Sequence, residues 1–186
     1  LLAFLMMSRG QRELPGTELT QLLQEPLAWY SAELQPSLFL KEMEANSGLL
    51  REVESGSYGF THKAIQEYLA AQYINGNSKR ESLVLGNLRD PYWREVVLTV
   101  AELGDASFLM EALLDGAEAS VEALALAEQI SRRALSLNPA HRDALAEILN
   151  KAAASEDPSR RAFAFEVQLR RRLAESLTLR PGVKVD

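Results

Sequence analysis

Cysteine is absent from the sequence, and histidine occurs only twice, at His62 and His141. Without thiols the chain can form neither disulfide bonds nor thiolate metal sites, so we expect a cytoplasmic protein. The two histidines are far apart and have no clustered carboxylate partners, so we expect no metal site. The formal net charge of -6 argues against binding to nucleic acid or to an anionic membrane.

The signatures of several enzyme classes are also missing. The chain has no Gly-Lys pair, which excludes a Walker A loop, whose backbone amides and lysine hold nucleotide phosphates. It has no Gly-x-Ser-x-Gly motif for a nucleophilic serine. His141-Arg142-Asp143 resembles a kinase catalytic loop, but Ile148 stands where that loop needs an asparagine. We therefore expect this chain to be no enzyme and to contain no catalytic residue.

Apolar residues make up 47% of the 186 residues, with alanine and leucine the commonest, which indicates a folded and mainly α-helical protein. The apolar run over residues 1–7 is too short to span a bilayer, so we expect no membrane insertion. The run has the pattern of a helix end. We therefore expect the first domain to be truncated at its N-terminus.

Residues 1–77 show the order of elements of a winged-helix domain. Helical spacing predicts three helices, over residues 1–9, from Thr17 to a stop at Pro26, and from Pro36 to a stop at Gly48. Gly10 and a polar turn that runs to Pro15-Gly16 are expected between the first two helices. Two short extended runs follow, and Ser55-Gly56-Ser57 between them predicts a β-hairpin, which we call the wing.

A further helix is expected directly after the wing. Thr61 has the side chain of a helix N-cap, and Asn75-Gly76 would end the helix. Ile65, Tyr68 and Leu69 have helical spacing, so we expect them to lie in the core.

Beyond residue 77 every segment has helical spacing. Turn residues divide it into pieces of similar length, at residues 80–88, 91–103, 106–114, 117–136, 139–154 and 159–177. Antiparallel helices joined by short turns predict a helical-repeat array over residues 78–177, of the HEAT or the TPR type. Residues 178–186 are expected to be a linker to a following domain.

A distinctive set of residues surrounds the wing. Gly48-Leu49-Leu50 precedes it, Phe60 and His62 follow it, and the next helix contains Gln66-Glu67-Tyr68 and then Ala70-Ala71. Further along, Trp93 precedes an apolar run. This set resembles the winged-helix end of NACHT-type STAND signalling ATPases, which include the NLR-like proteins.

The resemblance implies a regulatory, non-catalytic module that senses the nucleotide state of a neighbouring ATPase domain. In that family the histidine equivalent to His62 contacts the β-phosphate of ADP. The resemblance also implies that the full-length parent binds ADP or ATP, that the fragment alone binds neither, and that the parent forms homo-oligomers on activation. The partners would be the ATPase domain and a sensor or effector domain of the same chain.

The predicted position of His62 suits a phosphate contact. The first turn of a helix has free backbone N–H groups and the positive end of the helix dipole, both of which favour an anion. The same dipole favours the neutral imidazole, which still donates one hydrogen bond. We expect a modest contact, made only when the ATPase domain is present.

Five arginines near the end of the chain form the strongest basic feature: Arg160, Arg161, Arg170, Arg171 and Arg172. They can form a solvated face with local salt bridges, or a patch that docks a partner.

Two other functions remain open. One is a helical-repeat scaffold that binds a protein. The other, less favoured, is a DNA-binding winged helix, in which the helix before the wing would need a basic surface. That helix contains Lys41 next to Glu42 and Glu44, a poor surface for phosphates.

Overall fold

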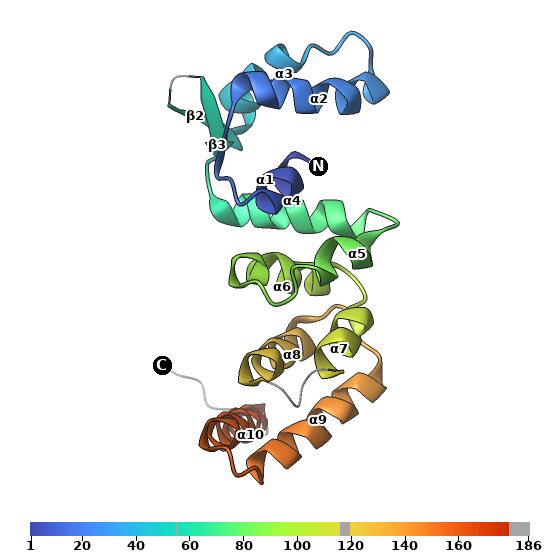
Figure 1. Ribbon diagram of the computed structural model, residues 1–186, viewed down its shortest axis with the longest axis vertical. Helices are drawn as coiled ribbons and strands as arrows, with labels where there is room; N and C mark the ends of the chain where they lie inside the picture. The colour runs from blue at the N-terminus through green and yellow to red at the C-terminus, as the bar shows by residue number, and fades with distance from the viewer. Residues whose placement is uncertain (55, 116–119, 179–186) are drawn as a thin grey trace. The chain divides into compact units, whose positions relative to one another are not determined.

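The computed structural model describes residues 1–54, 56–115 and 120–178 (Figure 1). The chain divides into two compact units, Leu1–Asp105 and Ala106–Asp186, which are described separately below. The fold is mainly α-helical, with a small antiparallel sheet near the N-terminus and helices throughout the rest. This confirms the predicted fold class of a winged helix followed by a helical array.

The sheet of the first unit has three antiparallel strands, β1 (Glu13–Pro15), β2 (Leu50–Glu54) and β3 (Ser57–Phe60), in the order β1-β3-β2. The two strands of the predicted wing are β2 and β3, and Gly56 between them has a φ of 82°, which favours glycine. On β3, Gly59 pairs with Glu13 on one side and Arg51 on the other. Alternation then places Tyr58 and Phe60 on the opposite face, which packs on the helices.

The winged-helix core lies between this sheet and three helical segments. These are α1 (Leu2–Ser8), α2 (Gly16–Tyr30) and α3 (Pro36–Glu42), the last continued by a π-helical turn (Met43–Ser47). The buried cluster contains one or more residues from each helix and from β1 and β2: Met6, Leu14, Leu19, Leu23, Leu27, Leu40 and Leu50. Gly48 ends the π-helical turn with a φ of 61°, as expected for the residue that stops this segment.

Two expectations for this region were wrong. Pro26 does not end the second helix but lies inside α2, which continues to Tyr30. A proline removes one backbone hydrogen bond, and here burial of Leu23 and Leu27 on either side of it keeps the helix intact. The segment before Pro15, expected to be a turn, forms the short strand β1, which pairs with β3.

The helix after the wing, α4 (Lys63–Asn75), packs against α1 and α6 (Arg94–Leu103), as the ribbon of this unit shows (Figure 1). Its buried apolar residues are Ala70, Ala71 and Ile74, and the two alanines let the neighbouring helices approach closely. Tyr68 was expected in the core, but its side chain is 47% exposed. The prediction was wrong because the small residues, rather than the aromatic one, face the packed neighbours.

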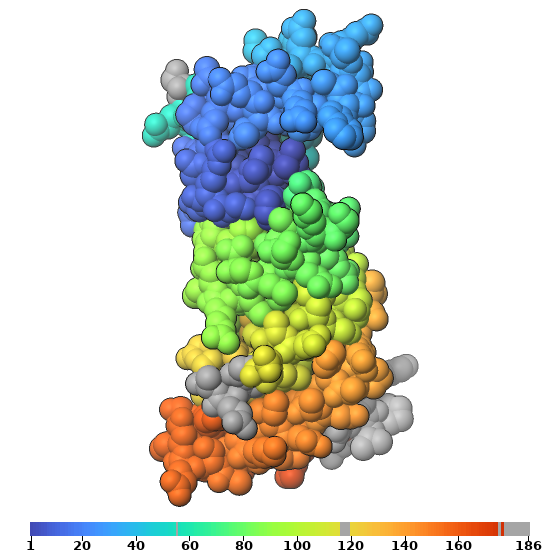
Figure 2. Space-filling model, turned by 45° about the vertical axis from the view of Figure 1, so that its right-hand side comes forward, coloured from blue at the N-terminus to red at the C-terminus, as the bar shows by residue number. Residues whose placement is uncertain are grey.

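Aromatic rings link the segment after α4 to the winged helix. Phe4 of α1 lies 5.2 Å from Tyr73 of α4 and 6.0 Å from Trp93, measured between ring centroids. Trp93 is 2% exposed and ends the 3-10 turn Pro91–Trp93 before α6. In the space-filling view, the surface of this unit passes directly from the dark-blue α1 to the green segment around α5 (Arg80–Leu85) (Figure 2). The boundary expected after residue 77 stays a prediction, while the first compact unit continues to Asp105.

The second unit contains α7 (Ser107–Leu114), α8 (Val121–Arg133), α9 (Pro139–Ala153) and α10 (Pro158–Thr178). Each helix packs on the next one along the chain, and α7 also contacts α9. The backbone of Ala106 donates to the carbonyl of Ser136 at 3.0 Å, which joins the start of α7 to the segment before α9. Residues 117–119, expected to begin a helix, lie outside the described residues, as do residues 179–186 of the expected linker.

Asx-Pro pairs begin three helical segments, namely the 3-10 turn Pro91–Trp93 of the first unit and α9 and α10 of the second. Asp90, Asn138 and Asp157 each precede a proline, and each side-chain oxygen accepts a hydrogen bond from the backbone N–H two residues later, at 2.8 to 3.0 Å. The proline needs no partner for its nitrogen and has the φ of a first helical turn. The sequence breaks at these pairs are therefore helix starts.

Among the described helices, none has the length and hydropathy required to cross a membrane.

Tyr58 gives the wing a pH-dependent stability. Burial raises the pKa of its hydroxyl above the ordinary 10.0, and the carboxylates of Glu52 and Glu44 raise it further. The unfolded chain therefore loses this proton at lower pH than the folded chain, so the stabilisation is complete below about pH 10 and is lost as the pH rises through the folded pKa. We expect the urea midpoint to fall in this range, and to fall less in Tyr58→Phe. Tyr30→Phe, at a side chain that is 89% exposed, is the control and should keep the wild-type profile.

Candidate functional site

His62 lies at the N-cap of α4, two residues after the end of β3, rather than inside the first helical turn. Its backbone is extended and its carbonyl accepts from the N–H groups of Ile65 and Gln66, at 3.0 and 3.3 Å. Its side chain makes no capping hydrogen bond and is exposed. The imidazole thus stands at the positive end of a 13-residue helix, open to a group from outside.

Thr61 does not cap α4, contrary to expectation. Its hydroxyl donates to the carbonyl of Gly48 at 2.5 Å, and its backbone N–H donates to Leu49 at 3.0 Å. These bonds hold the end of β3 to the chain just before β2. The hydroxyl is therefore already engaged, and the next residue, His62, becomes the N-cap.

The polar residues that follow His62 are partly buried and paired. Glu67 is 7% exposed, and its Oε1 lies 2.5 Å from the Nζ of Lys63, one helical turn earlier. The same ammonium group lies 5.0 Å from the ring centroid of Tyr92. Gln66 is 3% exposed and its Nε2 donates to the carbonyl of Gln11 at 3.5 Å. Gln66 therefore connects α4 to the segment before β1, whereas Glu67 forms an ion pair within α4.

A hollow opens beside the first turn of α4, on the outer face of the sheet. We call it the wing hollow, and its lining residues are Arg12, Glu13, Arg51, Val53, Gly59, Phe60, Thr61, Lys63 and Gln66. His62 is not one of them, although both of its chain neighbours are. The sequence-based reasoning missed this group because its members come from four separate segments that only the strand pairing brings together.

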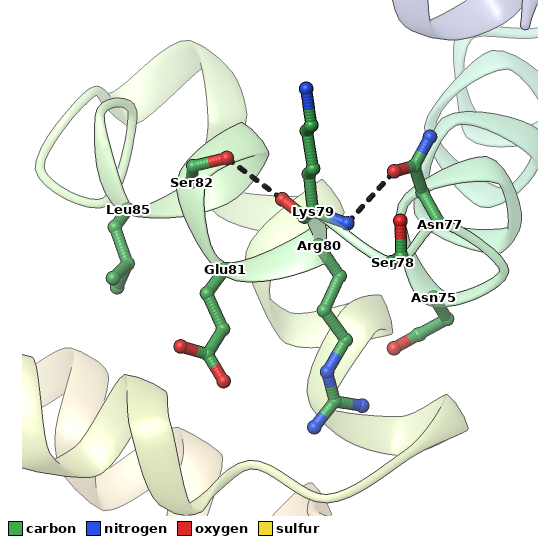
Figure 3. Close-up of a pocket in the computed structure, with 8 residues that line it drawn as sticks. All are labelled: Asn75, Asn77, Ser78, Lys79, Arg80, Glu81, Ser82 and Leu85. Carbon is green, nitrogen blue, oxygen red and sulfur yellow. Dashed lines mark hydrogen bonds between the residues drawn. The ribbon is translucent and has the colours of Figure 1, made fainter.

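A second hollow lies at the turn between α4 and α5, and several of its polar groups form hydrogen bonds that build that turn (Figure 3). The backbone N–H of Lys79 donates to Asn77 Oδ1 at 2.9 Å, and Ser82 Oγ donates to the Lys79 carbonyl at 2.9 Å. Arg80 donates to the carbonyl of Asp105 at 3.4 Å, and Asn75 Nδ2 donates to that of Val100 at 3.1 Å. These hydrogen bonds give the participating side chains a structural role.

The five C-terminal arginines do not form one free basic surface. Arg161 donates to the carbonyls of Ser155 and Glu156 at 2.7 and 2.9 Å, which fixes the loop before α10. Arg170 pairs with Glu166, one turn earlier, while Arg171 and Arg172 are exposed. Arg160 is half-buried. The partner-docking role of these residues stays a prediction.

Residues 1–74 match the family model described as the winged helix-turn-helix domain C-terminal to NACHT. Residues 1–74 are a NACHT-associated winged-helix domain. The resemblance proposed from the wing residues is thereby confirmed. Searches of curated proteins and of solved structures gave no match.

The NACHT-associated winged-helix domain uses most of its characteristic residues for structure. Gly48 supplies a left-handed turn, Leu50 is 2% exposed in the core, and Phe60 packs against that core. Ala70 and Ala71 are fully buried between helices. A winged helix of this kind is no catalytic ATPase core. Within the described residues, no group of three or more His, Asp or Glu side chains could hold a metal ion.

Proposed function

We propose that this chain is a regulatory, non-catalytic module of a NACHT ATPase. The winged helix would read the nucleotide state of the ATPase domain, and the helical array would relay it to a sensor or effector domain. The match of residues 1–74 to a domain that follows NACHT supports the association. The single observation that carries the sensing role is the position of His62, exposed at the N-cap of α4 without a capping bond.

The physical basis of sensing is a contact that differs between two nucleotide states. The imidazole N–H and the helix dipole both favour a phosphate oxygen close to the N-terminus of α4. A bound ADP would present its β-phosphate to His62, and replacement by ATP would change the charge and position of that end. A difference in contact free energy between the two states is sufficient to move the winged helix.

The test uses the protein that carries the NACHT domain together with these residues. His62→Ala removes one hydrogen bond to a charged group, so we expect ADP to dissociate about tenfold faster. The measurement is the release of a fluorescent ADP analogue in stopped flow. His62→Gln keeps a donor and should recover part of the loss.

Gln72→Ala is the matched control, because it changes an exposed residue of the same helix more than two turns away. It should leave the ADP release rate unchanged. Equal release rates in wild type and His62→Ala would contradict the proposed sensing role.

A further inference from the structure

We propose that the wing hollow binds a phosphate group. The residues that carry this inference are Arg12, Arg51, Lys63 and Gln66. The proposal does not rest on the nucleotide-sensing role, because His62 does not line the hollow. The wing hollow would be a separate anion site, and phosphate should bind to it in this chain alone, without any neighbouring domain.

Charge is the first argument. The lining contains three cationic side chains, from Arg12, Arg51 and Lys63, and one carboxylate, from Glu13. Among the residues that the structure describes, no side-chain hydrogen bond or ion pair engages Arg12 or Arg51. Glu67 pairs with Lys63, and Glu13 offsets a second cation, so three cationic groups against two carboxylates leave one net positive charge at the hollow of a chain whose net charge is -6. Guanidinium groups offer paired N–H donors that fit the oxygens of a phosphate.

The helix α4, which borders the hollow, also favours an anion there. The first turn of α4 contains no acidic residue and has no side-chain cap, so its positive end is not neutralised locally. Lys63 and Gln66, from the first and fourth positions of that helix, both line the hollow. Gln66 is only 3% exposed, and its amide nitrogen makes a long hydrogen bond of 3.5 Å to Gln11. A ligand in the hollow would meet a polar amide that is already held in place.

The volume of the wing hollow limits the size of its ligand. The hollow encloses about 230 Å³. Sites for whole drug-sized ligands occupy roughly 300–1,000 Å³, so this one suits a phosphate group and not a complete nucleotide. Gly59 forms part of the lining, and its missing side chain leaves the room that Glu13 and Val53 border.

The register of the sheet explains how distant residues meet here. Gly59 pairs with Glu13 and with Arg51, so the side chains of those two residues stand on either side of the glycine on one face. Arg12 directly precedes β1, and Lys63 begins α4 three residues after β3 ends. The basic group is therefore a product of the fold, held by three strands and a helix.

The experiment titrates the chain with inorganic phosphate at low salt, followed by the amide signals of Lys63 and Gln66 in NMR and by calorimetry. We expect saturable binding that shifts both residues. Arg12→Gln with Arg51→Gln should weaken it by about tenfold or more. The control is Arg89→Gln with Arg142→Gln, which removes the same charge at two exposed arginines and should bind like wild type.

A second variant acts in the opposite direction and needs no loss of fold. Glu13→Gln removes the one carboxylate of the lining, so phosphate should bind about threefold more tightly because one repulsive charge is gone. Weaker or unchanged binding in Glu13→Gln would contradict the site. Equal weakening in the Arg12/Arg51 and Arg89/Arg142 variants would also overturn it, since the effect would then be general charge.

Two further ligands, acetate and ADP, test which anion the hollow prefers and whether the phosphate belongs to a nucleotide. Acetate presents one charge and two oxygens, and binding as tight as that of phosphate would overturn the assignment. ADP that binds more tightly than phosphate, with the same dependence on Arg12 and Arg51, would identify the phosphate end of a nucleotide as the natural source. Equal affinities would identify free phosphate. His62→Ala should leave phosphate binding intact, so failure of the sensing role and failure of this site give different results.

Discussion

Gly59→Ala should destabilise the Leu1–Asp105 unit by about 2 kcal/mol, within the usual range for overpacking a well-packed site. A Cβ at this position would lie 2.8 Å from the backbone oxygen of Arg12, a contact that real Cβ atoms do not make. It would also lie 3.3 Å from Glu13 Cγ and 3.4 Å from Val53 Cγ2. Because the closest atom belongs to the backbone that leads into β1, relief requires the strand to move.

The measurement is urea unfolding followed by the fluorescence of Trp93. The chain has two tryptophans, and Trp29 is 84% exposed, so Trp29→Phe leaves Trp93 as the reporter at little cost. Gly86→Ala is the matched control, since nothing lies within 4 Å of its Cβ position and its φ is -61°. That variant should match wild type or gain about 0.5 kcal/mol. A Gly59→Ala midpoint equal to that of Gly86→Ala would show that β1 is not packed against β3 as described.

The sequence predicted the elements with strong local signals. The wing followed from Gly56 between two extended runs. The breaks predicted before residues 91, 139 and 159 lie at helix starts, because each contains an Asx-Pro pair whose side chain caps the following segment. The element that was missed, β1, has three residues and one buried side chain, too few to show a strand period. It exists because the edge of β3 offers it backbone partners, and this long-range pairing leaves no local pattern.

The residues of the candidate site could likewise be predicted only where their signal is local in the sequence. His62 was found because it is one residue in a recognised local motif. Its exact position depended on Thr61, whose hydroxyl is taken up by Gly48, a contact between residues 13 apart in sequence. The wing hollow could not be predicted, because Arg12 and Arg51 meet only through their common neighbour on β3. The burial of Gln66 and Glu67 could not be predicted either, because polar residues in a helix are normally expected to be exposed to solvent.

Residues Leu1–Asp105 form one compact unit, and we expect this unit to unfold in a single transition. Leu19 is fully buried in the winged-helix core, whereas Trp93 lies after the sequence boundary expected at residue 77. If the contacts of α4 with α1 and α6 join these segments into one unit, damage at Leu19 must be felt at Trp93. Leu19→Ala should then lower the stability reported by Trp93 by about 3 kcal/mol, the usual cost of a buried leucine cavity.

Leu145→Ala provides the matched comparison, because Leu145 is also fully buried but belongs to α9 of the second unit. In the Trp29→Phe background, Leu145→Ala should leave the Trp93 transition in place while lowering a separate transition seen by circular dichroism. If Leu19→Ala leaves the midpoint of the Trp93 transition unchanged, the folding boundary lies near residue 77 instead. The rings of Phe4, Tyr73 and Trp93 argue for the larger unit, because they bury aromatic surface from both sides of that boundary in one cluster. The contact of α4 with α6 within this unit is the structural reason to expect a single transition.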